Sequence, residues 1–77
     1  MNKILFFAHL RDVVGGESIE WDAKGLKVTD LKKLISEKYK AINLDNVMTA
    51  INEEFASDEE IIHEGDMIAF IPPVSGG

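Results

Sequence analysis

Short stretches of the chain have the apolar pattern of β-strands. Residues 3–10 form a continuous apolar run that is too short for most helices and rich in β-forming side chains. Residues 18–22 alternate polar and apolar positions, as a half-buried strand does. Residues 47–51 and 55–56 flank a polar turn, and residues 67–71 form a last apolar run. This pattern predicts five strands.

Between the second and third of these strands, the apolar positions take the spacing of a helix. The predicted helix has one apolar stripe, made of Leu31, Leu34, Ile35 and Tyr39. Thr29 or Asp30 is expected to cap its N-terminus. Residues 57–60 fit a capping-box pattern and are expected to start one further helical turn. The predicted element order is therefore β-β-α-β-β-β.

Alternation also predicts what each face of the first and last strands carries, if these strands lie side by side. One face is expected to meet the helix through Ile4, Phe6, Ile68 and Phe70. The other face carries Leu5, Phe7, Ala69 and Ile71. We therefore predict an α+β roll, a mixed sheet with one main helix packed on one face. The uncovered face becomes an exposed apolar patch, which usually marks a surface for a partner.

The size of the chain and its lack of cysteine narrow the function classes. Its 77 residues suit a single domain over residues 1–77. Without cysteine, the chain has no disulfide, no thiolate metal site and no cysteine nucleophile. Its two histidines, His9 and His63, lie too far apart in the sequence for metal-ligand spacing, so we expect no bound metal. The fold must depend on apolar packing.

The charges are divided unevenly along the chain. The formal net charge is −6, and residues 41–77 contain eight carboxylates and no Lys or Arg. An acidic surface repels phosphate backbones and anionic membranes, so we expect neither nucleic acid nor membrane as partner. It attracts a basic protein surface, although acidity alone also serves solubility. No signal peptide and no membrane-spanning stretch is apparent, so we expect a cytoplasmic protein.

No arrangement typical of catalysis is apparent, and the end of the chain is the strongest candidate for chemistry. It reads Pro72, Pro73, Val74, Ser75, Gly76 and Gly77. Two prolines stiffen and extend a chain, and glycines let a backbone enter a narrow site. We interpret residues 72–77 as an extended tail that carries the carboxylate of Gly77 into a partner's active site, where it needs activation, for example by adenylation. A frayed, inert terminus is the alternative.

Three segments together resemble a known family. Residues 3–15 read K-I-L-F-F-A-H-L-R-D-V-V-G, residues 50–53 read A-I-N-E, and residues 64–77 read E-G-D-M-I-A-F-I-P-P-V-S-G-G. The chain resembles the MoaD family, the small subunits of molybdopterin synthase, over essentially its whole length. The resemblance implies a β-grasp (ubiquitin-like) fold.

It also implies a function, that of a sulfur carrier in molybdenum cofactor biosynthesis. An E1-like enzyme would adenylate Gly77 with ATP, and a sulfur donor acting through that enzyme would convert it to a thiocarboxylate. The tail would enter the active site of the large synthase subunit and pass its sulfur to cyclic pyranopterin monophosphate, within a heterotetramer of two small and two large subunits.

The same resemblance assigns roles to residues. Gly77 carries the chemistry and Gly76 gives it access, while the threading arm consists of Pro72, Pro73, Val74 and Ser75. The family's interface positions match Phe7, Phe55 and Ile71. The carrier is then no enzyme on its own and binds no cofactor, because the activating partner uses the ATP.

Three other functions remain open from the sequence. A thiamine-pathway sulfur carrier shares the fold and the Gly-Gly end. A ubiquitin-like modifier would join its activated carboxylate to a lysine. A plain interaction module would have an inert tail.

Overall fold

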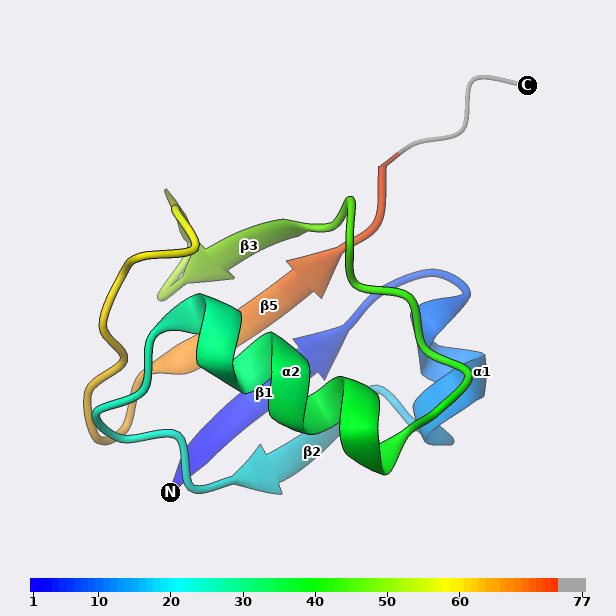
Figure 1. The fold of residues 1–77 in the computed structure, drawn as a ribbon, viewed down its shortest axis with the longest axis horizontal. Coiled ribbons are helices and arrows are strands. Elements are labelled where there is room, and N and C mark those ends of the chain that lie inside the picture. Colours follow the sequence, from blue (N-terminus) through cyan, green and yellow to red (C-terminus); the bar gives the residue numbers. More distant parts are fainter. Residues whose placement is uncertain (74–77) are drawn as a thin grey trace.

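A five-stranded mixed sheet forms the centre of the computed structural model, which describes residues 1–73 (Figure 1). Its strands are β1 (Asn2–Phe6), β2 (Ser18–Trp21), β3 (Met48–Ile51), β4 (Glu54–Ala56) and β5 (Met67–Ile71). They lie in the order β2-β1-β5-β3-β4. The two helices are α1 (Leu10–Val14) and α2 (Val28–Lys38). The predicted mixed sheet with a main helix on one face is confirmed.

The first and last strands lie side by side in the middle of the sheet. β1 and β5 run parallel, with Ile4 beside Ile68 and Phe6 beside Phe70. The other strand pairs, β1–β2, β3–β5 and β3–β4, are antiparallel. Both central strands are apolar on both faces, which suits the centre of a sheet better than its edge. The two predicted faces assumed that the first and last strands lie side by side, and the structure confirms this.

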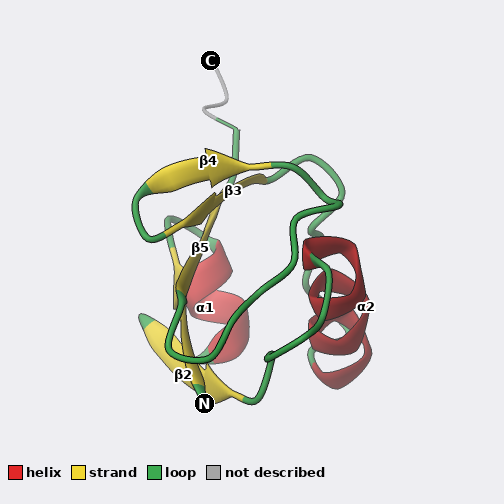
Figure 2. Ribbon diagram, turned by 90° about the vertical axis from the view of Figure 1, so that its left-hand side faces the viewer, coloured by secondary structure: helices red, strands yellow, loops and turns green. Residues whose placement is uncertain are grey.

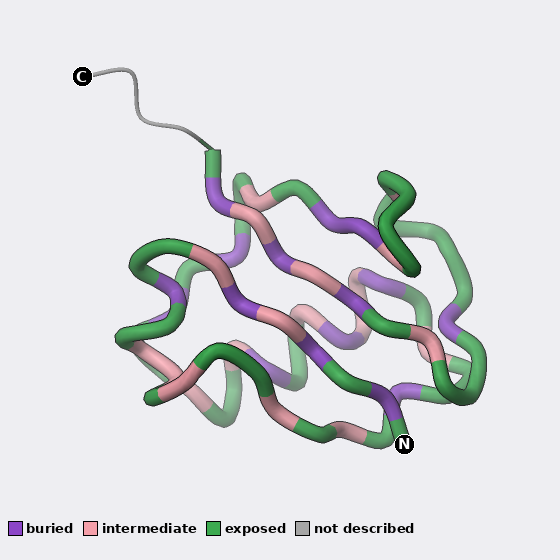
Figure 3. Tube along the Cα trace, turned by 180° about the vertical axis from the view of Figure 1, so that it is seen from behind, coloured by how far each residue is buried: buried purple, intermediate pink, exposed green. Residues whose placement is uncertain are grey.

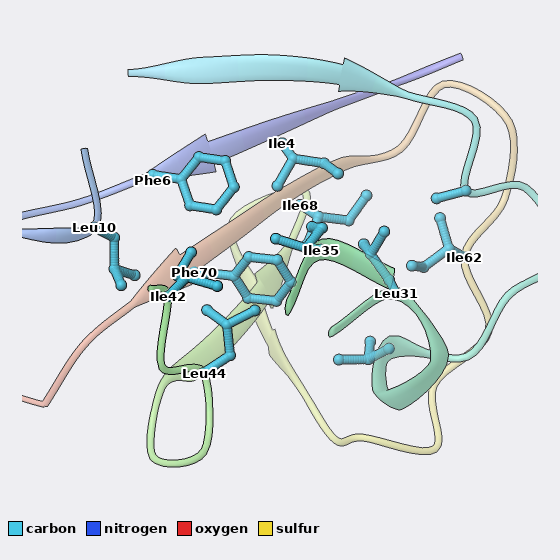
Figure 4. Packing of buried hydrophobic residues seen from close by; sticks show 12 residues of the cluster. Ile4, Phe6, Leu10, Leu31, Ile35, Ile42, Leu44, Ile62, Ile68 and Phe70 are labelled. Carbon is cyan, nitrogen blue, oxygen red and sulfur yellow. The ribbon is translucent and has the colours of Figure 1, made fainter. Parts of the chain in front are cut away.

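The core lies between the sheet and α2 (Figure 4). The sheet contributes Ile4, Phe6, Ile68 and Phe70, all of them fully buried as predicted. The rings of Phe6 and Phe70 meet with their centroids 6.0 Å apart at a tilt of 42°. From α2, Leu31 and Ile35 are fully buried, whereas Leu34 is 38% exposed and lies at the margin of the stripe. Burial of each large side chain stabilises the fold by roughly 1.5–3 kcal/mol.

The first strand is shorter than predicted, because the chain turns sharply after Phe6. Ala8 has a φ of 55°, a backbone conformation that does not continue a strand. Leu10 then begins α1 and buries its side chain in the core. The prediction of a strand over residues 3–10 was therefore wrong at its end, and α1 was missed. Apolar Leu10 extends the run in the sequence, but it reaches the core from a helix.

The N-terminus of α2 also differs from the prediction. Its cap is Lys27, and not Thr29 or Asp30. Asp30 lies inside the first turn and accepts a hydrogen bond from the backbone N–H of Lys27 at 3.3 Å. The first backbone N–H groups of a helix have no acceptor within the helix, and here another segment accepts their hydrogen bonds. Val28 N–H donates to the Glu60 carbonyl and Thr29 N–H to the Asp58 carbonyl, each at 3.0 Å.

The segment that meets this helix end, residues 57–60, forms a hydrogen-bonded turn and not the predicted helical turn. Two ion pairs add to its contacts with α2, Lys32–Asp58 at 2.8 Å and Lys27–Glu59 at 3.1 Å. The capping-box pattern was misleading because these carbonyls cap α2 instead of continuing as a helix of their own. Figure 2 shows the long loop that carries them back beside α2. Neither helix within residues 1–73 has the length and apolar content needed to span a membrane.

Candidate functional site

The face of the sheet opposite α2 carries an open apolar groove. Figure 3 views this side and shows buried residues alternating with half-buried or exposed ones along β1 and β5. The groove has a volume of about 270 Å³ and is lined by Leu5, Phe7, Ala50, Glu53, Phe55, Met67, Ala69 and Ile71. It contains all four residues that strand alternation left uncovered. Because side chains alternate along β1 and β5, these two strands contribute residues both to the core and to this groove.

The three predicted interface residues all line the groove, although they come from three parts of the chain. Phe7 follows the end of β1, Phe55 lies on the edge strand β4, and Ile71 ends β5. Phe55 is 76% exposed, an unusual position for a phenylalanine, while Phe7 and Ile71 are half-buried. Apolar side chains gathered on one exposed face are typical of a protein interface.

Three groove residues were not predicted from the sequence, namely Ala50, Glu53 and Met67. Met67 could have been found, because it lies two residues before Ala69 on the same strand and so shares its face. Ala50 needs the pairing of β3 with β5, which places it beside Ala69. Glu53 depends on the geometry of a turn, for which the alternation of strands provides no signal.

That turn joins β3 to β4 through only two residues, Asn52 and Glu53. Their φ angles are 51° and 71°. A two-residue hairpin turn with positive φ at both positions twists in the same sense as the strands that it joins. Asparagine tolerates this conformation, whereas glutamate favours it far less than glycine does. The tight turn brings Glu53 and Phe55 to the groove.

A hydrogen-bond network holds this hairpin against the start of β5. The Asn52 side chain donates to Asp66 Oδ1 at 2.9 Å and accepts from the backbone N–H of Met67 at 3.0 Å. Asp66 Oδ2 accepts from the backbone N–H of His63 at 2.9 Å. These two donors, the His63 amide first, hold the pKa of the Asp66 carboxyl below its usual 3.8. The ionised carboxylate thus helps to fix the margin of the groove.

The base of the predicted tail adjoins the groove, because Ile71 lines the groove and is followed by the two prolines. Pro72 is buried and Pro73 is exposed. Both line a small depression of about 160 Å³ together with His9, Asn43, Asn46 and Val47. Pro72 is therefore packed on the domain, and Pro73 is the first exposed residue of the predicted arm. Val74, Ser75, Gly76 and Gly77 lie outside the described residues.

The two histidines lie in different surroundings. His9 belongs to the depression at the base of the tail, and His63 lies beside the Asp66 turn. Over residues 1–73, no three side chains of His, Asp or Glu are grouped in a way that could hold a metal ion. The groove itself contains one ionisable side chain, that of Glu53. Its geometry suits binding to an apolar surface.

Comparison with known proteins gives a consistent result over the whole chain. The model of the ThiS family matches residues 4–77. The chain is similar to the molybdopterin synthase sulfur carrier subunit of Escherichia coli (strain K12), with 33% identity over 81 residues and all of both chains covered. The protein of that name from Dictyostelium discoideum is 40% identical, with 97% of this chain and 94% of the relative covered.

Among solved structures, the chain is similar to the small archaeal modifier protein 1 of Methanosarcina acetivorans. The TM-score is 0.82 at 25% identity, and the match covers 99% of this chain and 95% of the other. This likeness confirms the predicted β-grasp (ubiquitin-like) roll. The structure adds α1 to the single helix that was predicted.

Proposed function

Because the chain belongs to the ThiS family, we propose that it is a sulfur carrier subunit of molybdopterin synthase and acts in molybdenum cofactor biosynthesis. The observation that carries this proposal is its similarity to molybdopterin synthase sulfur carrier subunits, which extends over the full length of the chain. The Gly76-Gly77 end and the apolar groove support it. The carrier contributes a reactive terminus, and its partners contribute the catalytic groups.

The proposed chemistry takes place at the C-terminal carboxylate. A carboxylate oxygen of Gly77 attacks the α-phosphate of ATP in an E1-like enzyme, which forms an acyl adenylate and releases pyrophosphate. A sulfur nucleophile delivered by a donor then displaces AMP and leaves a thiocarboxylate. In the large subunit, this sulfur forms a bond to cyclic pyranopterin monophosphate, and water then cleaves the bond between the sulfur and the Gly77 acyl carbon, which regenerates the carboxylate. Gly76 has no side chain to obstruct a narrow channel, which suits its predicted role beside the reacting group.

The groove is the proposed docking surface for the large subunit. Phe7, Phe55 and Ile71 would provide the apolar contact, and the acidic residues of the second half of the chain would attract a basic rim on the partner. Ile71 connects the two parts of the function, since it contacts the partner only two residues before Pro73 starts the exposed arm. Docking at the groove therefore sets the point from which residues 73–77 enter the partner.

Intact mass spectrometry of the protein purified from its host tests the carrier function. Replacement of one carboxylate oxygen by sulfur raises the mass by about 16 Da. We expect this species in cells that make the cofactor, and its persistent absence there contradicts the proposal. Deletion of Gly77 serves as the control. It should remove the heavier species and abolish sulfur transfer, with thermal unfolding unchanged because the core lies within residues 4–70.

A second candidate function is conjugation to other proteins. The similarity to small archaeal modifier protein 1 favours it, since the name of that protein describes a modifier. In this case the activated carboxylate of Gly77 would acylate a lysine and release AMP. If the protein is found joined to targets by isopeptide bonds and no thiocarboxylate is detected, conjugation is its function and the carrier proposal is wrong. For a thiamine-pathway carrier, the thiocarboxylate would form but would yield no molybdopterin with the large subunit.

A further inference from the structure

The side chain of Arg11 connects helix α1 to the groove. The central carbon of its guanidinium lies 5.5 Å from the centroid of the Phe7 ring. Its Nε donates a hydrogen bond to the Phe6 carbonyl at 2.9 Å, and its Nη1 lies 3.7 Å from Glu17 Oε1. Arg11 therefore contacts the groove residue Phe7 while it is bonded to the strand end that precedes that residue.

Phe7 needs such a contact, because the sheet does not hold it. β1 ends at Phe6, and Ala8 turns the chain with its positive φ. The carbonyl of Phe7 accepts a hydrogen bond from Leu10 at 3.2 Å, which fixes the backbone but leaves the ring free to choose its rotamer. Phe7 is only half-buried, so packing alone restrains the ring less than it restrains Phe6.

The backbone of Arg11 is well fixed, and its side chain is partly exposed. Its carbonyl accepts hydrogen bonds from Gly15 at 2.9 Å and Gly16 at 3.1 Å, which close the end of α1. Gly15 reaches this position with a φ of 81°, a conformation that glycine adopts without strain. Leu10, fully buried beside it, anchors the helix in the core. The short helix thus holds the backbone of Arg11 in a constant place relative to β1.

From these contacts we propose that Arg11 is a positioning residue for docking: it holds the Phe7 ring in its binding orientation before the partner arrives. The inference rests on the proposed function, in which the groove binds the large subunit. A planar guanidinium over a ring face is attracted by the ring's electrons, and the bond from Nε fixes its plane. Lysine has neither the plane nor this donor. A ring that is already oriented loses less freedom when the partner binds.

A double-mutant cycle tests the inference through binding of the full-length protein to the purified large subunit, measured by calorimetry. We expect Arg11→Met and Arg11→Lys each to weaken binding by about threefold to tenfold. In a Phe7→Ala background, Arg11→Met should change affinity by less than about twofold, because its effect acts through the ring. Lys33→Met removes one exposed positive charge from α2, on the far side of the sheet, and should leave affinity unchanged.

The ring provides a second readout that needs no partner. In NMR spectra of the free protein, Arg11→Lys and Arg11→Met should shift and broaden the ring signals of Phe7, while those of the core residues Phe6 and Phe70 stay in place. Unchanged Phe7 signals overturn the inference. So does an equal loss of affinity in both backgrounds, since Arg11 would then contact the partner directly. If Phe7→Ala itself leaves affinity unchanged, the groove is not the docking surface, and the proposed docking fails while the mass test of the carrier function still stands.

Discussion

The two faces of the sheet are built from the same strands and differ in almost every physical respect. Phe6 is fully buried against α2, and Phe7, the next residue, lines an open groove. Phe70 and Ile71 repeat this arrangement at the end of β5. The covered face provides apolar burial that stabilises the fold, whereas the groove leaves apolar area in contact with water. Residues that stabilise the fold and residues of the proposed docking surface therefore alternate along the same strands.

The largest loss of stability is expected for a substitution on the face of the sheet that α2 covers. Phe70→Ala should destabilise the protein by about 3–5 kcal/mol, because it removes a fully buried ring and leaves a cavity beside Phe6. Urea unfolding followed by circular dichroism measures this change. The matched variant Ile71→Ala, on the groove face, should lower the unfolding free energy by less than about 1.5 kcal/mol. Equal losses in the two variants would mean that both faces support the fold.

On the groove face, the expected effect appears in binding. Phe55→Glu should weaken binding to the large subunit at least about tenfold, because it replaces an exposed ring of the proposed docking surface with a charge. Its unfolding free energy should change little, since Phe55 is 76% exposed. Leu34→Glu is the control, an exposed apolar residue of α2 on the opposite side of the sheet. If both variants bind equally well, the groove is not the docking surface.

The separation of the faces could be read from the sequence, because it depends on local alternation. Once Ile4 and Phe6 lie on one face, Leu5 must lie on the other, whatever the rest of the chain does. The three residues predicted for the interface came from two sources, Phe7 and Ile71 from alternation and family resemblance together and Phe55 from resemblance alone, and their role in binding stays a prediction. The structure places all three on one groove.

Features that depend on contacts between distant segments could not be read in this way. The N-terminus of α2 is capped by carbonyls of residues 58 and 60, which no local pattern reveals. Leu10 continues an apolar run and so concealed both the turn at Ala8 and helix α1. The contact of Arg11 with Phe7 was missed for the same reason, since it exists only because that turn and helix follow the strand.

The hairpin at the margin of the groove offers a smaller, stabilising change. Glu53 has a φ of 71°, which a side chain makes unfavourable and glycine does not. Glu53→Gly should therefore stabilise the protein by about 1 kcal/mol, measured by urea unfolding. Glu53→Ala removes the same carboxylate but keeps a Cβ, so it should give little gain. A similar gain in the two variants would assign the effect to charge and not to backbone conformation.

The smallest predicted effect is on the free energy of unfolding at acidic pH. Since the folded protein lowers the pKa of Asp66, ionised Asp66 stabilises the fold above its usual pKa of 3.8, and this contribution is lost as the pH falls through the folded value. Asp66→Asn cannot accept both hydrogen bonds and should be less stable than the parent near pH 5. Urea unfolding between about pH 5 and pH 2 should show this difference shrinking towards acid. A constant difference would mean that the Asp66 charge contributes nothing.

The place of β5 in the sheet has a consequence for how the protein is made. β5 is the last strand that a ribosome produces, yet it lies between β1 and β3 and joins the two halves of the sheet. Before it emerges, the β1–β2 and β3–β4 pairs share no ladder of hydrogen bonds, so the five-stranded sheet can form only after β5 has been made. Gly76 and Gly77 follow β5 after residues 72–75. A chain that stops before β5 therefore lacks both the central strand of the sheet and the residues at which the proposed chemistry takes place.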